Sequence, residues 1–257
     1  MDRLVNSPVF ILSTARAGST LLQRMMNAHS LIRAGHELHL CDVTVNLEAP
    51  GVQIAMRNLG LSRRDLENML WDRVLHHELV RSGKQVIVDK NPDNSLNWRR
   101  ISDYWPNARY ILLLRHPGST LRSVIEMMHN EIIPFVNGEQ GALNVTGVDG
   151  AALYYIKKQL NAITAARDAL SGLTARYEEL VTDPVGVTQE ICSYLSVPWE
   201  RGMLEYGKSA QDPIGAFLGD TSSNIRSGQV QPGKLPPARE EIPDGILAAC
   251  QALGYSA

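Results

Sequence analysis

One short segment near the start of the chain combines small residues, hydroxyl groups and an arginine. Residues 14–20 read Thr-Ala-Arg-Ala-Gly-Ser-Thr. Small residues allow a backbone to turn sharply and to approach a ligand closely. Arg16 can hold an anion through two hydrogen bonds, and Ser19 and Thr20 add hydroxyl groups. This combination indicates a binding site for a phosphate-like group.

A strand and a helix are expected to position this segment. Residues 9–12 form an unbroken apolar run, which is typical of a buried parallel strand. A helix is expected to begin at Ser19, with apolar residues at positions 21, 22, 25 and 26. Backbone N–H groups at the start of a helix attract anions. The segment is therefore predicted to be an anion-binding loop between a central strand and its helix.

Two common nucleotide-binding patterns do not match this loop. The Walker A pattern requires a lysine directly before its Ser or Thr, and here Gly18 holds that position. The dinucleotide pattern G-x-G-x-x-G is absent as well. Ordinary P-loop nucleotide hydrolysis is therefore disfavoured.

Two further apolar runs end at a basic residue. Strands are predicted over residues 85–89 and 108–114, which Lys90 and Arg115 follow directly. Ser123 lies eight positions after Arg115, on the helix that is expected next. Ligands of open α/β sheets bind at the carboxyl ends of the strands, so both cations are expected beside the loop. An exposed lysine and a structural arginine–carboxylate pair are the alternative interpretations.

Two histidines flank a glutamate in the sequence His36-Glu37-Leu38-His39. The H-E-x-x-H spacing of a zinc site is missing and no third ligand stands out, so a metal site is disfavoured. From the residues alone, the remaining interpretation is a polar loop with one or two hydrogen-bonded histidines.

Taken together, these segments resemble the sulfotransferases that use 3′-phosphoadenosine 5′-phosphosulfate (PAPS), in particular bacterial secondary-metabolite and protein-tyrosine sulfotransferases. The loop resembles their P-R/K-S-G-[ST]-T pattern, with Ala15 in place of the proline. Asp-Lys-Asn-Pro at 89–92 resembles their K-T-P or K-D-P loop, and Arg115-His116-Pro117 with Ser123 resembles their R-x-P and helix-serine site. Residues 176–184 and 225–234 resemble two later segments of the same enzymes.

The resemblance implies which residues bind the nucleotide. The loop would bind the 5′-phosphosulfate, Arg115 and Ser123 the 3′-phosphate, and Tyr177 the adenine. Arg226 and the Gly228 backbone would also meet the 3′-phosphate, and Ser227 the phosphosulfate. The expected nucleotide-binding residues are thus Ala15, Arg16, Ala17, Gly18, Ser19, Thr20, Arg115, Ser123, Tyr177, Arg226, Ser227 and Gly228.

The resemblance also implies catalytic roles. Glu37 is the first choice for the base that takes the acceptor's hydroxyl proton, and His39 is the second. Arg16 and Lys90 would stabilise charge on the sulfuryl and leaving phosphate oxygens. No metal is expected. The acceptor is expected to be a hydroxyl group of a small molecule or of an acyl chain held on a carrier protein, in secondary metabolism.

The expected fold is a P-loop-like three-layer α/β sandwich, a mostly parallel sheet with helices on both faces, in a single domain over 1–257. Residues 207–240 are expected to be a mobile loop over the nucleotide. Residues 130–150 are either a lid on the acceptor pocket or a plain connection. Helices are also predicted over 62–82, 95–104, 149–170, 185–195 and 241–253, a strand over 173–177, and a loop with one helical turn over 48–60.

Composition excludes several other classes of protein. The net charge of the 257 residues is −2, so no broad nucleic-acid or anionic-membrane surface is expected. The three cysteines, Cys41, Cys192 and Cys250, are too widely spaced to suggest a disulfide framework or a zinc site. No apolar run reaches about 18 residues and no signal pattern is present, so a cytoplasmic protein is expected.

Two other functions remain open at this stage. A P-loop small-molecule kinase would share the fold but would need ATP, magnesium and a Walker lysine. A non-catalytic nucleotide-binding protein would keep the phosphate loops but would have no use for Glu37 together with Lys90. The oligomeric state is not indicated by the sequence.

Overall fold

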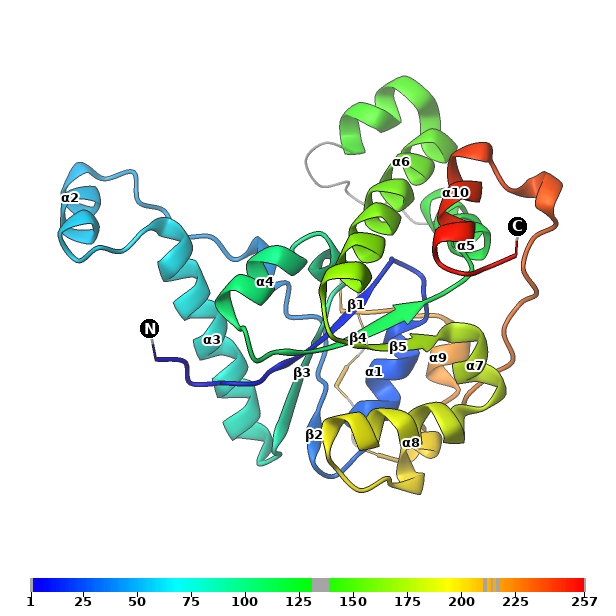
Figure 1. The fold of residues 1–257 in the computed structure, drawn as a ribbon, viewed down its shortest axis with the longest axis horizontal. Coiled ribbons are helices and arrows are strands. Elements are labelled where there is room, and N and C mark those ends of the chain that lie inside the picture. The colour runs from blue at the N-terminus through cyan, green and yellow to red at the C-terminus, as the bar shows by residue number, and fades with distance from the viewer. Residues whose placement is uncertain (1, 131–138, 210–211, 214, 216–217, 257) are drawn as a thin grey trace.

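A parallel sheet forms the middle layer of the protein (Figure 1). The computed structural model describes residues 2–130, 139–209, 212–213, 215 and 218–256. Over these residues a five-stranded sheet runs in the order β2-β3-β1-β4-β5, and every pair of neighbouring strands is parallel. The strands are β1 (Val9–Ser13), β2 (Ile32–Arg33), β3 (Val86–Lys90), β4 (Arg109–Leu114) and β5 (Leu173–Arg176). The predicted three-layer α/β fold is confirmed.

Alternate residues of the central strand face two separate cores. Val9 and Ile11 pack against one set of helices, while Phe10 and Leu12 pack against another. The first core receives residues of α1 (Ser19–Asn27) and α8 (Pro184–Leu195). The second receives residues of α3 (Arg63–Ser82), α4 (Trp98–Tyr104), α5 (Pro117–Asn130), α6 (Glu139–Ala169) and α10 (Asp244–Ala252). Apolar burial on both faces explains why β1 and β4 are continuous apolar runs.

The strand order places a crevice at the ends of β1 and β4. From β1 the chain moves to β2 and β3 on one side, and then crosses to β4 on the other side. Ligands of open α/β sheets bind outside the carboxyl ends of the strands at such a reversal. The loop at 14–18 follows β1 and Arg115 follows β4, so both lie at this point.

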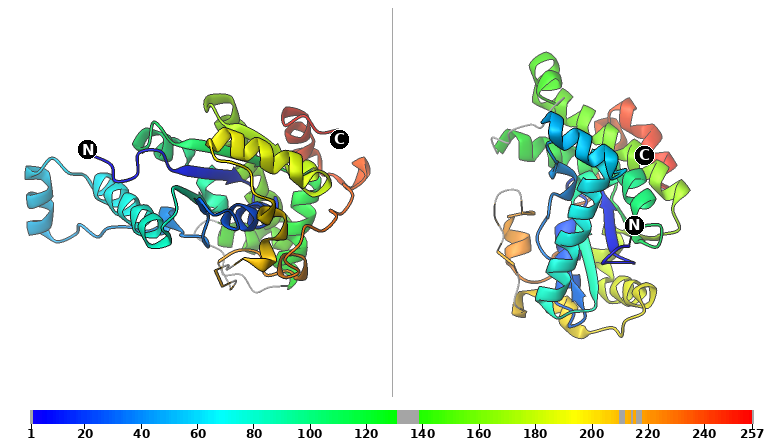
Figure 2. Two further views of the ribbon diagram at one scale, coloured as in Figure 1. Left: turned by 90° about the horizontal axis from the view of Figure 1, so that it is seen from below. Right: turned by 90° about the vertical axis from the view of Figure 1, so that its left-hand side faces the viewer.

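The helix α3 lies within the predicted range 62–82 and has a capping residue at each end. Ser62 caps it and forms a reciprocal capping box with Asp65, and Gly83 ends it with a φ of 65°. The loop prediction for 48–60 is wrong in part, because α2 (Pro50–Asn58) is a nine-residue helix with Pro50 at its first position. None of its residues is buried, and it stands away from the rest of the molecule (Figure 2).

Other boundaries differ from the predictions. The helix expected over 95–104 is split into a 3₁₀ turn at Pro92–Ser95 and α4. The helix α6 begins at Glu139 rather than 149 and is broken at Gly147, whose φ of 71° is not helical. Residues 131–138 of the predicted lid lie outside the described residues, as do 210–211, 214 and 216–217 of the predicted covering loop.

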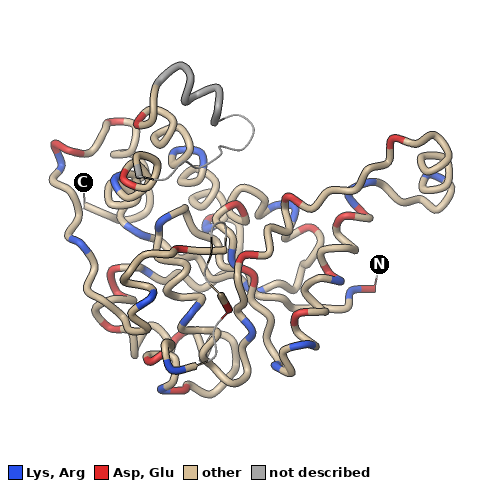
Figure 3. The backbone as a smooth tube through the Cα atoms, turned by 180° about the vertical axis from the view of Figure 1, so that it is seen from behind, with Lys and Arg blue, Asp and Glu red and all other residues tan. Residues whose placement is uncertain are grey.

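The remaining helical elements are short. They are η1 (Leu40–Asp42), η2 (Pro92–Ser95), α7 (Tyr177–Thr182), η3 (Arg201–Lys208), α9 (Ser223–Arg226) and η4 (Arg239–Glu241). Basic and acidic residues are interspersed along the chain, as Figure 3 shows. Over the described residues, none of the helices has the length and apolar character needed to cross a membrane.

Candidate active site

The loop after β1 is a tight turn with strained backbone. The Ala17 N–H donates to the carbonyl of Thr14 at 3.3 Å, which closes a four-residue turn. Arg16 is the third residue of the turn and has a φ of 61°. A positive φ at this position is the signature of a type II turn, and for a residue other than glycine it costs about 1–3 kcal/mol. Such a conformation persists only where neighbouring groups hold it.

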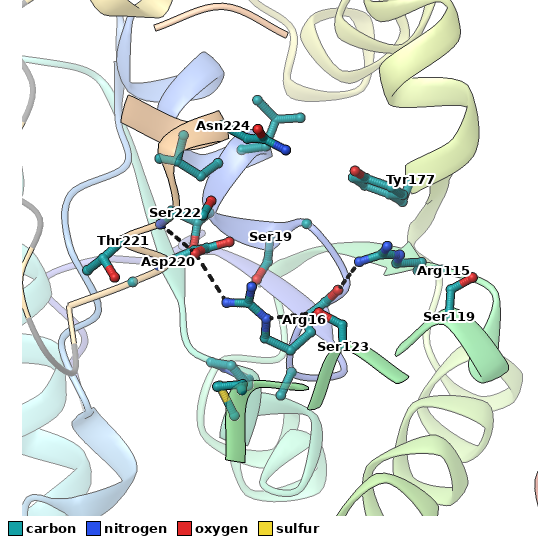
Figure 4. Close-up of a pocket in the computed structure, with 18 of the residues that line it drawn as sticks. Arg16, Ser19, Arg115, Ser119, Ser123, Tyr177, Asp220, Thr221, Ser222 and Asn224 are labelled. Carbon is teal, nitrogen blue, oxygen red and sulfur yellow. Dashed lines mark hydrogen bonds and ion pairs between the residues drawn. The ribbon is translucent and has the colours of Figure 1, made fainter. Parts of the chain in front are cut away.

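Arg115, which follows β4, and Ser123 on α5 hold Arg16 in this conformation (Figure 4). The Arg115 guanidinium donates to the carbonyl of Arg16 at 2.6 Å. The Arg16 Nε in turn donates to the Ser123 hydroxyl at 3.2 Å. The predicted 5′-phosphosulfate loop and the predicted 3′-phosphate pair are therefore in direct contact.

A cavity of about 930 Å³ opens at the loop. The predicted residues that line it are Ala15, Arg16, Gly18, Ser19, Thr20, Glu37, Arg115, Ser123 and Tyr177. Ala17 is fully buried under the loop. Lys90 and His39 both contact Glu37, which lines the cavity. The structure thus brings most of the predicted site residues together around one cavity.

Glu37, Lys90 and Thr20 form a connected cluster at the edge of the loop. The Lys90 ammonium forms a close ion pair with Glu37 and donates to the Thr20 hydroxyl at 3.3 Å. Only 1% of the Lys90 side chain and 11% of the Glu37 side chain are exposed. His39 Nε2 lies 3.6 Å from the other Glu37 oxygen. Both candidate bases are therefore close together, but only Glu37 is among the cavity-lining residues.

Arg115 is a half-buried cation that faces the cavity without a counter-ion. Over the described residues its guanidinium contacts the Arg16 carbonyl and lies 4.4 Å from the centre of the Tyr177 ring, but no carboxylate lies within ion-pair distance. Burial lowers the pKa of Arg115. Since buried charges are normally paired, this guanidinium fits an anionic ligand.

Tyr177 packs directly on the loop. A Cβ on Gly18 would lie 2.3 Å from a carbon of the Tyr177 ring, and Gly18 has a φ of 88°. No other residue type fits here, for both reasons. Tyr177 therefore lies between Gly18 and Arg115, and its predicted contact with adenine stays a prediction.

An acidic residue beside Arg16 was not predicted. Asp220 Oδ1 lies 3.2 Å from the Arg16 guanidinium, and the Asp220 N–H donates to the Thr20 hydroxyl at 3.0 Å. Figure 4 shows Arg16 between Asp220 on one side and Arg115 on the other. A segment near the end of the chain therefore contacts the predicted anion-binding loop at Arg16 and Thr20.

Arg226, Ser227 and Gly228 are not among the described residues that line the cavity. Arg226 and Ser227 are exposed, and Gly228 packs against Gly207. Their neighbours Asn224, Ile225, Gln229 and Gln231 line the cavity instead. The predicted contacts of these three residues with the nucleotide stay predictions.

The structure adds several lining residues that the sequence analysis did not select. They include Ser119, Arg122, Tyr155, Lys158, Asn224 and Lys234. Ser119 could have been found, because it precedes Ser123 by four positions and so shares its helix face. The described residues contain no group of three or more His, Cys, Asp or Glu side chains placed to hold a metal ion.

Comparisons with known proteins agree on one family. A family model described as "Sulfotransferase family" matches residues 8–201. An uncharacterised protein of Aquifex aeolicus is 24% identical over 256 residues, which cover 93% of this chain and 32% of that protein. Protein-tyrosine sulfotransferase A of Caenorhabditis elegans is 21% identical over 216 residues, 77% of this chain and 52% of that protein. This chain thus spans about a third to a half of the length of these relatives.

Among solved structures, the sulfotransferase domain from the curacin biosynthetic pathway shares the fold. Its TM-score is 0.68 at 22% sequence identity, and the match covers 99% of both chains.

Proposed function

This chain belongs to the sulfotransferase family, and from that premise we propose that it transfers a sulfuryl group from PAPS to a hydroxyl group of an acceptor. Bound PAPS would supply the activated sulfuryl group. No metal takes part in the proposed transfer.

The observation that carries this proposal is the guanidinium of Arg115 at the cavity, which has no carboxylate partner among the described residues. Ser119 and Ser123 line the same wall from α5. One guanidinium and two hydroxyl groups suit a phosphate, because an arginine can donate two parallel hydrogen bonds to it. In this proposal they hold the 3′-phosphate, and the Tyr177 ring lies against the adenine.

The loop and Arg16 would hold the other end of the nucleotide. The loop leads into the N-terminus of α1, where unpaired backbone N–H groups carry partial positive charge. These N–H groups and Arg16 are placed to stabilise negative charge that develops on the leaving 5′-phosphate.

Glu37 and Lys90 would act at the transferred group. The Glu37 carboxylate takes the proton of the acceptor hydroxyl, whose oxygen forms the new bond to sulfur as the bond from sulfur to the 5′-phosphate oxygen breaks. Lys90 neutralises charge on the sulfuryl oxygens. In the free protein the two side chains neutralise each other, so Lys90 keeps a partner when no nucleotide is bound.

For the acceptor we propose a small molecule or a carrier-bound acyl chain, in secondary metabolism. Leu96, Met127 and Met128 line the cavity, which suits a carbon skeleton. The similarity to a domain from a biosynthetic pathway supports the same class. The proposed location is the cytoplasm.

Calorimetric titration of PAP, the desulfated nucleotide, tests the proposal. The wild-type chain is expected to bind PAP, and Arg115→Ala to bind it at least about tenfold more weakly, which is about 1.4 kcal/mol. Arg109→Ala is the matched control: Arg109 lies at the other end of β4 and donates to the Leu195 carbonyl, away from the cavity. PAP affinity should be unchanged in this variant.

ATP with and without magnesium distinguishes the alternatives. Equal binding of ATP and PAP, or magnesium-dependent ATP turnover, would contradict the proposal and favour a kinase. Tight PAP binding without transfer from PAPS to a broad panel of hydroxyl acceptors would favour a non-catalytic nucleotide-binding protein.

A further inference from the structure

A glutamine from a distant helix holds the second residue of the predicted anion-binding loop. The Ala15 N–H donates to Gln159 Oε1 at 2.7 Å, across 144 positions of sequence. Gln159 lies on α6 and is completely buried, and Ala15 is 8% exposed. A buried backbone N–H costs free energy if it has no acceptor. The hydrogen bond to Gln159 therefore avoids this cost for the Ala15 N–H.

The turn itself explains why Ala15 needs such a partner. Ala15 is the second residue of the Thr14–Ala17 turn, and proline is common at this position of a type II turn. A proline would fix φ through its ring and would have no N–H to satisfy. Alanine leaves φ free and exposes a donor. The turn in this chain is therefore held by a tertiary hydrogen bond instead of a ring.

A second hydrogen bond orients the glutamine. Gln159 Nε2 donates to the Tyr155 hydroxyl at 2.9 Å, one helical turn earlier on α6. With its amide nitrogen engaged in this way, Gln159 presents its oxygen to the loop. Tyr155 lines the cavity, so the chain of bonds runs from the cavity wall to the loop.

We infer that Gln159 is a positioning residue for nucleotide binding: it fixes Ala15 and thereby keeps Arg16 in its strained conformation. Arg115 holds the Arg16 carbonyl from the other side of the same turn. Without Gln159, the free loop relaxes, and a ligand must restore the turn before it can bind. The inference rests on the proposed function in that the ligand is taken to carry a 5′-phosphate.

A double-mutant cycle with Ala15→Pro tests the inference. Gln159→Leu alone is expected to weaken PAP binding about tenfold. In the Ala15→Pro background, the same change is expected to alter PAP affinity by no more than about twofold, because the N–H that needs the glutamine is gone. Gln159→Met repeats the measurement if Gln159→Leu does not fold.

Two comparisons separate positioning from general destabilisation. Gln159→Leu should lower the affinity for 5′-AMP by the same factor as the affinity for PAP. It should leave the affinity for 3′-AMP within about twofold of wild type. Thr188→Val is the matched control. Thr188 lies on α8 and is completely buried, and its hydroxyl accepts a hydrogen bond from the Trp199 ring N–H. Removing this acceptor should lower the melting temperature without changing PAP affinity.

The outcomes are distinct. If Gln159→Leu weakens PAP binding equally with Ala15 and with Ala15→Pro, or weakens it in neither, the inference is overturned, while the proposed function stands as long as the wild type binds PAP. Failure of the wild type to bind PAP would instead overturn the proposed function, and the inference with it.

Discussion

Glu37 has a basic side chain on each side of its carboxylate. Lys90 pairs with one oxygen, and His39 Nε2 lies 3.6 Å from the other. Asn91 and Asp42 also contact the His39 ring, and 35% of the His39 side chain is exposed. The carboxylate is thus the more enclosed of the two candidate bases, and Lys90 links it to Thr20.

Glu37→Gln separates catalysis from binding. The change keeps the size of the side chain but removes the proton acceptor, so transfer is expected to fall about 10²–10⁴-fold. PAP affinity should remain within about threefold of wild type. The measurements are calorimetry with PAP and transfer from PAPS to any acceptor that the wild type sulfates. Near-normal transfer, together with a large loss in His39→Gln, would assign the base to His39.

Site residues that follow an apolar strand could be predicted, and those from distant segments could not. Arg115 follows β4 directly, Lys90 is the last residue of β3, and Arg16 lies three positions after the end of β1. Parallel strands bring these ends together. Gln159 and Asp220 reach the loop across 144 and 200 positions, the latter counted to Thr20. Each is an ordinary polar residue in its own segment, so only the tertiary fold reveals its role.

At the scale of elements, the patterns of apolar residues predicted most of the fold. The strands β1, β3 and β4 and the helix α3 lie within a residue or two of their predicted positions. The strand β2 has only two residues and exists through its pairing with β3, so no local pattern could indicate it. The helix α6 extends beyond its prediction because a glycine break separates its first turns from the regular stripe.

The contact between η3 and the segment after α9 positions several cavity residues. Gly207 and Gly228 touch through their backbones: the Gly207 N–H donates to the Gly228 carbonyl at 3.0 Å. A Cβ on Gly228 would lie 2.6 Å from the Gly207 Cα, and the φ of Gly228 is 72°. The Tyr206 hydroxyl also reaches the Ile225 and Gln229 carbonyls. The lining residues Asn224 and Gln229 therefore depend on this contact.

Gly228→Ala is expected to displace this segment, because neither backbone can yield to the added carbon. PAP binding should weaken roughly tenfold, as measured by calorimetry. Gly202→Ala is the matched control in η3, since a Cβ there meets nothing within 4 Å. Unchanged PAP affinity in Gly228→Ala would show that the segment does not contribute to binding.

At the scale of the whole molecule, one buried carboxyl is expected to shape the pH dependence of stability. Asp89 is 1% exposed; one oxygen accepts from Asn94 at 2.7 Å and the other has no partner among the described residues. Burial raises the pKa of Asp89 to about 6, although the Asn94 hydrogen bond opposes this. The folded protein therefore prefers the protonated carboxyl, and this stabilisation is lost as pH rises from about 4 through 6.

Asp89→Asn should remove this part of the pH dependence. A pKa change from near 4 to about 6 corresponds to roughly 3 kcal/mol, so the variant should gain up to that amount relative to wild type between pH 4 and pH 8. Urea unfolding over this range measures it. Asp103→Asn, at a carboxylate 69% exposed, is the control. Parallel profiles for wild type and Asp89→Asn would contradict the assignment.

The cavity is lined by segments from early and late parts of the chain. The Asp220 N–H donates a hydrogen bond to the Thr20 hydroxyl at the start of α1. A ligand that bridges these segments binds the folded chain and has no comparable site on an unfolded one. Its binding energy is therefore added to the global stability, by about 2.7 kcal/mol at a concentration of 100 times its Kd. Folding and occupancy of the cavity are thermodynamically linked, so heat or denaturant should release the ligand in the same transition that unfolds the sheet.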